Sequence, residues 1–317
     1  MPYNNHNYGG PMKATHEIVP EMLPNEGEFS DPFFRRFTLR TAKIPLKLTE
    51  TIEKDYKFPT FYKDVTCAIA IFFCSYDNAH TLVSAGLGPK VKPVRMPRKR
   101  ALVAFSCYEY KRVMNVAPYN EIAMTIPVMA DPGVNVPVLP MVADKWFSRF
   151  GYYVFGMPVT SRENQLRGNR IWGLPKITQD IDIVEKDGLC VVTAMEADGQ
   201  PYLKLRIPTT GKPTRFDVTS HLYSSLKGKM LKSETNFKAQ FRVNKYMDQM
   251  FKKRQTPDRN YIVIGDTPSA RVLKDLKIEA HPFQFRYTPD MTSCFDLPDP
   301  EFRFDALLPQ PHHAHAY

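Results

Sequence analysis

Short apolar or alternating runs recur along the chain from about Phe58, separated by glycine, proline, aspartate or asparagine. Runs of this length that are rich in β-branched and aromatic residues are typical of strands. Between residues 237 and 243, apolar side chains alternate with lysine, glutamine and arginine, which predicts one face on a core and the other in water. We predict at least nine strands: Val65–Phe73, Ala101–Tyr110, Glu121–Met129, Tyr152–Gly156, Gln179–Val184, Leu189–Met195, Tyr202–Ile207, Phe237–Val243 and Tyr261–Ile264.

Helical signals are few. We expect one helix that is capped by Asp77 or Asn78 and ends near Gly86 or Gly88, and a second that starts at Thr267. Helices of ten to fifteen residues do not alternate with the strands, which argues against a doubly wound α/β fold. The fold class we predict is mainly β (α+β), an antiparallel β-rich barrel with a few peripheral helices.

The 317 residues are compatible with one or two domains. The first thirty or so residues are rich in Asn, Gly, Pro, Glu and Met without periodicity. We therefore expect a partly irregular N-terminal arm at 1–57, a barrel domain at 58–309 and a flexible tail at 310–317. The histidines of the last six residues belong to that tail rather than to a metal site.

Charge and composition exclude several classes of protein. The net charge of +10 comes from scattered basic residues without interleaved aromatics, so we expect no nucleic-acid partner, although an anion-binding module stays open. No apolar run reaches the roughly 18 residues of a membrane span, and the N-terminus lacks the order of a secretory signal, so we expect no membrane association and a cytoplasmic protein. The five cysteines have no C-x-x-C spacing, which predicts buried thiols and no metal site.

The segment RGNRIWGLPKI, residues 167–177, is the first candidate for chemistry. Lys176 follows a rigid proline and is flanked by apolar residues, and apolar surroundings disfavour the charged ammonium and lower its pKa. A neutral lysine is a nucleophile. The alternative is a surface lysine at the start of a strand, with its stem lying over Trp172.

The segment PYNEIAMTIP, residues 118–127, is the second candidate. Glu121 enters an apolar run that we expect to be buried, and a buried carboxylate is usually paired or functional. The alternative is an exposed glutamate at the end of a strand.

The combination of YNE with GNRIWGLPK some fifty residues later resembles the acetoacetate decarboxylase superfamily. In that family a tyrosine-x-Glu segment supplies an active-site carboxylate, and a G-R-E-x-x-G-(F/Y)-P-K segment supplies a Schiff-base lysine. The resemblance places Lys176 on that lysine and Glu121 on the carboxylate, and it extends from about Phe58 to about Pro309. It also implies a cone-shaped β-rich barrel around a mostly apolar cavity, and it is consistent with a homo-oligomer.

Two departures from the family pattern bear on the reaction. Ile177 stands where the decarboxylase has a second lysine, so we expect burial alone to depress the pKa of Lys176. Arg170 stands where the family has an acidic residue. We expect Arg170, Tyr119 and Trp172, which belong to the same two segments, to bind the substrate.

The resemblance implies a lysine-dependent Schiff-base lyase without a cofactor. The expected substrate is a β-keto acid or a related carbonyl compound, which would undergo decarboxylation or an aldol, retro-aldol or dehydration reaction. The alternative from another class is a non-catalytic barrel that binds an apolar small molecule.

Overall fold

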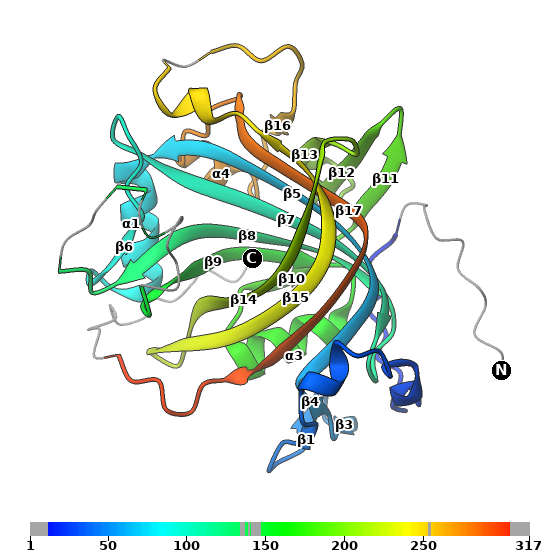
Figure 1. Cartoon of the computed structure of the whole chain (residues 1–317). Helices are drawn as coiled ribbons and strands as arrows, with labels where there is room; N and C mark the ends of the chain where they lie inside the picture. The colour runs from blue at the N-terminus through cyan, green and yellow to red at the C-terminus, as the bar shows by residue number, and fades with distance from the viewer. Residues whose placement is uncertain (1–11, 134–136, 139, 141–146, 253–254, 305–317) are drawn as a thin grey trace.

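The computed structural model describes residues 12–133, 137–138, 140, 147–252 and 255–304. Seven long strands form a closed ring, because β9 pairs with both β8 and β14. Figure 1 shows these strands curving around a common interior. In ring order they are β9 (Phe150–Val159), β14 (Lys212–Leu226), β15 (Lys229–Lys245), β17 (Pro282–Pro298), β5 (Thr60–Ser75), β7 (Arg100–Val113) and β8 (Tyr119–Ala130).

Short strands extend or accompany the ring. Strand β6 (Val91–Pro93) pairs with β8, and β10 (Lys176–Thr178) pairs in parallel with β9. The remaining short pairs are β1 (Arg40–Thr41) with β4 (Lys57–Phe58) and β2 (Leu46–Lys47) with β3 (Glu53–Lys54).

A second, four-stranded sheet packs on the outside of the ring. It consists of β11 (Ile181–Lys186), β12 (Leu189–Met195), β13 (Pro201–Pro208) and β16 (Ile262–Ile264). Its buried side chains, such as Ile183, Val192 and Leu205, share one core cluster with Phe72 and Phe105 of the ring. The main core therefore lies between the ring and this sheet, and the interior of the ring is left for a cavity.

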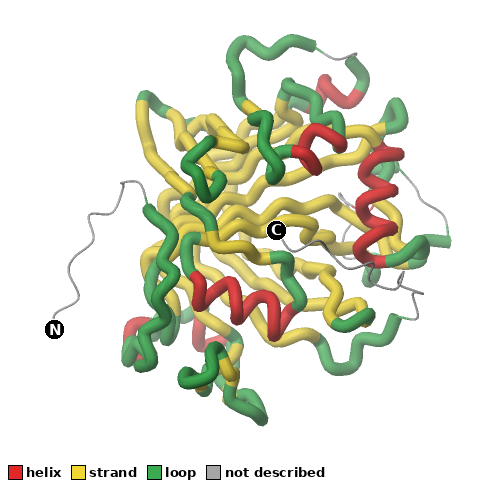
Figure 2. The backbone as a smooth tube through the Cα atoms, turned by 180° about the vertical axis from the view of Figure 1, so that it is seen from behind, coloured by secondary structure: helices red, strands yellow, loops and turns green. Residues whose placement is uncertain are grey.

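The helices lie outside the strands, as Figure 2 shows from behind. They are α1 (Tyr76–Leu87), α3 (Arg162–Trp172) and α4 (Arg271–Asp275), with the 3₁₀ turns η1 (Glu26–Glu28), η2 (Phe34–Arg36) and η4 (Met247–Met250). None of the described helices is long and apolar enough to cross a membrane.

The N-terminal residues that the structure describes are packed against the ring. Phe29, Phe33 and Phe34 form a buried cluster with Phe61 of β5 and Met114. The ring centroids of Phe34 and Phe61 are 4.7 Å apart. This segment therefore buries apolar surface of its own. The predicted tail at 310–317, with its histidines, lies outside the described residues.

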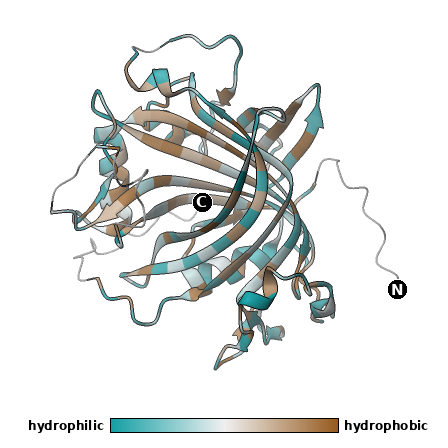
Figure 3. Cartoon of the chain, in the orientation of Figure 1, coloured by the Kyte–Doolittle hydropathy of each residue, from teal (hydrophilic) through white to brown (hydrophobic). Residues whose placement is uncertain are grey.

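The predicted mainly β fold is confirmed, and each of the nine predicted strands overlaps an observed one. In β15, Phe237 and Phe241 face the cavity and Lys238 and Arg242 are exposed, as the alternation predicted. Figure 3 shows the same mixture of hydrophobic and hydrophilic positions along the ring strands. The cap prediction for the first helix was wrong: the side chain of Ser75, not of Asp77 or Asn78, accepts the capping hydrogen bond.

The pattern of apolar and polar positions predicted neither α3 nor β14, nor the short strands β1–β4, β6 and β10, and a final strand in the place of β17 was expected, as far as Tyr287, only from the family resemblance. Many residues of β14 and β17 are polar, and a proline interrupts β17. Neither strand therefore has the apolar run that predicts a strand. The five cysteines are free and buried, as predicted.

Candidate active site

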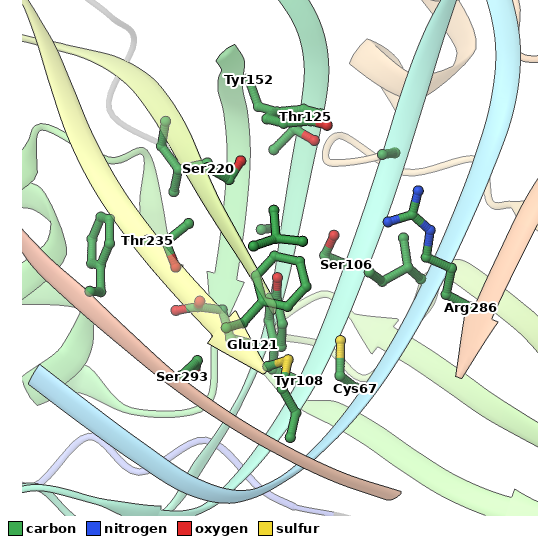
Figure 4. Close-up of a pocket in the computed structure, with 18 of the residues that line it drawn as sticks. Cys67, Ser106, Tyr108, Glu121, Thr125, Tyr152, Ser220, Thr235, Arg286 and Ser293 are labelled. Carbon is green, nitrogen blue, oxygen red and sulfur yellow. The ribbon is translucent and has the colours of Figure 1, made fainter. Parts of the chain in front are cut away.

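The interior of the ring contains a cavity of about 330 Å³. Side chains at alternate positions of the ring strands line it, as the two-residue period of a strand requires. On β8 these are Glu121, Ala123, Thr125 and Pro127, and on β7 they include Ser106 and Tyr108. Figure 4 shows part of this lining, with Glu121 and Tyr108 near one end of the cavity and Thr125 and Tyr152 near the other.

Lys176 reaches the cavity because α3 ends abruptly. Gly173 adopts φ = +60°, a left-handed conformation that ends the helix, and a Cβ at this position would lie 2.7 Å from the carbonyl carbon of Ser225. The chain then turns through Leu174 and Pro175 into β10, whose residue Lys176 pairs with Met157 of β9. The residues before Lys176, for which the sequence pattern predicted no helix, therefore form the end of a helix and its C-cap.

Gly168 makes room for the lysine side chain. A Cβ on Gly168 would lie 2.6 Å from Cε of Lys176 and even closer to Cδ. The side chain of Lys176 therefore lies directly against the backbone of α3. This contact explains why a glycine is needed eight residues before the lysine.

Lys176 and Glu121 form a buried ion pair. Nζ of Lys176 is 2.5 Å from Oε2 of Glu121, and the two side chains are 8% and 6% exposed. The hydroxyl of Tyr110 donates to the other carboxylate oxygen at 3.4 Å. The structure thus brings together the two residues that the sequence marked as candidates, fifty-five positions apart, and both line the cavity.

Tyrosines surround this pair. The ring of Tyr110 contacts the rings of Tyr62, Tyr119 and Tyr108, with centroid distances of 4.6, 4.8 and 5.2 Å. Burial raises the pKa of Tyr62 to about 12 and raises the pKa of the other three well above the usual value. These hydroxyls therefore stay protonated at neutral pH, and that of Tyr110 is the one that donates to the Glu121 carboxylate among the described contacts.

The electrostatic surroundings act on Lys176 in both directions. Burial lowers the pKa of Lys176, the charge and hydrogen bond of Glu121 raise it, and the charge of Arg167 lowers it, with a net decrease. The sequence led us to expect that burial alone lowers the pKa of Lys176, but the charge of Arg167 lowers it as well. Ile177 points away from the site and is 37% exposed, so this position does not supply a cavity group.

Arg167 is fixed behind the lysine. It is 2% exposed, its guanidinium donates to Asn164 and Thr60 at 3.0 Å each, and it lies 4.3 Å from the centroid of Tyr56. The neighbouring Glu163 does not neutralise it directly, because that carboxylate accepts hydrogen bonds from Lys54 at 3.0 Å and Tyr56 at 2.5 Å.

The three residues expected to bind substrate are placed differently. Tyr119 is buried and does not line the cavity, but its ring centroid is 5.7 Å from Nζ of Lys176. Trp172 lies outside the cavity lining; its indole donates to the carbonyl of Asp296 at 2.7 Å and its ring packs on Phe295. Arg170 is exposed on α3 and donates to the carbonyl of Lys47. We therefore retain only Tyr119 near the site and withdraw Trp172 and Arg170, because the helical turn directs them away from the cavity.

Two cations, one buried and one half-buried, were not singled out from the sequence. Arg167 belongs to the recognised segment, but only a helix places it behind the lysine. Arg286 lies on β17, where the family resemblance predicted a final strand but no functional residue, and it lines the cavity. Among the described residues, no group of three or more His, Cys, Asp or Glu side chains is arranged to bind a metal ion.

Comparisons with known proteins bear on the family and the fold. The profile of a family described as acetoacetate decarboxylase (ADC) matches residues 43–243. The chain is similar to the crystal structure of acetoacetate decarboxylase from Legionella pneumophila, with a TM-score of 0.51 and 11% identity over 86% of this chain and 93% of that one. A search of curated proteins found no match.

Two further solved structures are similar at lower TM-scores. One, from structural studies of acetoacetate decarboxylase, has a TM-score of 0.48 and 15% identity over 76% of this chain and 87% of that chain. The other is the enduracididine biosynthesis enzyme MppR complexed with pyruvate, with a TM-score of 0.47 and 10% identity over 76% and 88%.

Proposed function

Because this chain belongs to the acetoacetate decarboxylase family, we propose that it is a lysine-dependent Schiff-base lyase that acts on a β-keto acid or a related oxo compound. In this proposal Lys176 is the nucleophile and Glu121 transfers protons. The proposal extends to a cytoplasmic protein that assembles as a homo-oligomer and needs no cofactor.

The observation that carries the proposal is the Lys176–Glu121 pair inside a largely apolar cavity. Lysine must lose a proton to attack a carbonyl carbon, and the carboxylate oxygen 2.5 Å from Nζ is placed to accept it. Burial and the charge of Arg167 lower the pKa of the lysine, which makes that transfer easier.

The first step conserves atoms as follows. The amine of Lys176 adds to the carbonyl carbon, and one amine proton together with the proton held by Glu121 leaves with the carbonyl oxygen as water. The product is an iminium ion whose nitrogen keeps one proton. In a β-keto acid the bond to the carboxylate carbon then breaks, carbon dioxide leaves, and the electron pair moves toward the iminium nitrogen to give an enamine.

The second half returns the protein to its starting state. A solvent proton relayed by Glu121 adds to the enamine carbon, and water then hydrolyses the iminium to release the ketone and the free lysine. An aldol or retro-aldol reaction would use the same enamine, with a different bond to carbon formed or broken.

The proposal is tested by borohydride trapping. Acetoacetate is mixed with the protein, borohydride is added, and the intact mass and peptide map are measured. We expect an adduct on Lys176 in the wild-type chain and none in Lys176→Arg, because arginine stays protonated and cannot form an imine.

Lys54→Arg is the matched control. Lys54 is also buried and paired with a glutamate, at 3.0 Å from Glu163, but it does not line the cavity, so this variant should keep the adduct. An adduct on another lysine, or an adduct that survives in Lys176→Arg, contradicts the mechanism. A folded wild-type protein that forms no adduct with acetoacetate or with pyruvate would favour the alternative of a barrel that only binds an apolar small molecule.

A further inference from the structure

The charged side chains of the cavity do not balance. Among the described residues that line it, Glu121 is the only acid, and Lys176 and Arg286 are the only lysine or arginine side chains. Glu121 is already paired with Lys176. One guanidinium is therefore left in the cavity without an anion from the lining.

The guanidinium of Arg286 is held in place while some of its N–H donors have no partner. Its guanidinium carbon lies 4.9 Å from the centroid of Phe216, and Nη2 donates to Oε1 of Gln284 at 3.2 Å. Its Nε is buried without a hydrogen-bond partner, and within the described part of the chain Arg286 forms no ion pair. Burial lowers the pKa of Arg286, which indicates that its charge is poorly solvated. A guanidinium offers five N–H donors, and a carboxylate accepts two of them at once.

The position of Arg286 follows from the strand register. Arg286 is aligned with Ile69, Ile69 with Ser106, and Ser106 with Ala123, which is two residues along β8 from Glu121. In the ring of seven, β17 is three strands from β8 and three from β9, so Arg286 is on the wall opposite Glu121 and β10. Figure 4 shows Arg286 well separated from Glu121.

Within the described residues no hydrogen bond or ion pair joins Arg286 to Lys176 or Glu121, so a group bound by Arg286 is distinct from the carbonyl group at Lys176. Neighbouring strands are about 4.8 Å apart, so three spacings place the two backbones on the order of 14 Å apart along the wall. The lining includes apolar residues such as Ile69 and Ala123, and hydroxyl groups such as Ser106 and Thr125. The part of a ligand that lies along this surface is therefore better an uncharged carbon chain than a second charged group.

We propose that Arg286 binds a carboxylate of the substrate that is separated by a chain of several carbons from the carbonyl group attacked by Lys176. The ligand class is thus a longer oxo acid with a remote carboxylate. This inference rests on the proposed function for the carbonyl end, and on the charge balance and register for the carboxylate end.

The carboxylate end is tested without imine chemistry. Hexanoate, which has no carbonyl group to form an imine, is titrated calorimetrically into the wild-type chain, Arg286→Met and Arg242→Met. Arg242 is exposed on the neighbouring strand β15 and does not line the cavity, so it controls for loss of one arginine. We expect Arg286→Met to weaken binding roughly tenfold to a hundredfold, as loss of a charged hydrogen bond predicts, and Arg242→Met to leave it unchanged.

Whether one ligand uses both Lys176 and Arg286 is tested by comparing the trapping of two ketones. Borohydride trapping of 6-oxoheptanoate is compared with trapping of 2-heptanone, a neutral ketone of the same chain length. We expect the wild-type chain to reach half-maximal trapping at roughly tenfold lower concentration of the oxo acid. Arg286→Met should remove this preference, and Arg286→Lys should restore part of it.

The outcomes separate the two proposals. Failure of both ketones to form an adduct would overturn the proposed function, and hexanoate binding that depends on Arg286 would still support the carboxylate subsite. Hexanoate affinity that is equal in the wild type and Arg286→Met, or too weak to measure in the wild type at millimolar concentration, would overturn the subsite. An unchanged preference in a folded Arg286→Met variant would do the same.

Discussion

At the scale of single residues, the reactivity of the site depends on the pKa of Lys176, which neighbouring charges shift in opposite directions. Glu121 holds its ammonium group by an ion pair at 2.5 Å, whereas burial and the charge of Arg167 disfavour that ammonium. Arg167 belongs to α3, next to the glycine on which the lysine packs. The family pattern places a cation directly after the lysine, whereas here Arg167 of α3 supplies the positive charge that lowers the pKa of Lys176.

Two substitutions should therefore move the pH dependence in opposite directions. Glu121→Gln removes the anion that raises the pKa of Lys176, so this pKa should fall and the rise of trapping rate with pH should shift to lower pH. Arg167→Met removes a cation that lowers the same pKa, so the rise should shift to higher pH. Single-turnover trapping rates between pH 5 and 10 would measure both shifts.

Arg167→Lys is the control for this pair, because it keeps the positive charge and should leave the profile close to that of the wild type. Circular dichroism would verify that each variant is folded. Shifts of the same sign in Glu121→Gln and Arg167→Met, or an unmoved profile in both, would contradict the assignment of Lys176 as the titrating group.

At the scale of elements, the contact between α3 and β10 sets the geometry of the site. Gly168→Ala should leave the helix formed, because alanine is a better helix former than glycine, yet its Cβ would displace the lysine side chain. We expect the trapping rate to fall roughly 100-fold, since a displacement of about 1 Å can cost that much. Thermal unfolding measured beside the rate would separate displacement from loss of fold.

Gly27→Ala is the matched control, because a Cβ at this position meets nothing within 4 Å. It should change neither the trapping rate nor the unfolding temperature. A Gly168→Ala variant that reacts as fast as the wild type would show that the lysine can take another path to the cavity.

The same elements mark the limit of what the sequence predicts. Most ring strands have apolar or alternating runs, so local pattern was enough to find them. The helix α3, with the sequence RENQLRGNRIW, is mostly polar and has a central glycine, so it lacks an apolar stripe. The similarity of two short segments predicted that Lys176 and Glu121 share a site. Arg286 could not be predicted, because its position opposite them depends on the closure of the ring.

At the scale of the whole molecule, the N-terminal segment contributes to stability. Phe34 is 2% exposed and contacts Phe29, Phe33 and Phe61. Phe34→Ala should lower the free energy of unfolding by about 3–5 kcal/mol, the usual cost of removing a buried phenylalanine, as measured by denaturant titration. Phe251→Ala, at a position that is 72% exposed, should change it by less than about 0.5 kcal/mol. Equal effects of the two substitutions would mean that the segment does not belong to the folded body.

The place of β10 beside the ring has a consequence for how this architecture can diversify. Along one edge of β9, β14 pairs only at Tyr152 and Tyr153, and β10 takes the same edge from Met157 to Val159. Lys176, the proposed nucleophile, is thus carried by a short strand that pairs with β9 beyond the point where β14 leaves it, whereas the ring strands form the cavity. Lys176 and the ring strands of the cavity wall are therefore encoded by different stretches of the chain. Substitutions in the ring strands can change which molecule enters the cavity while Lys176 is preserved. Substitutions in β10 can change the chemistry without changing the cavity wall.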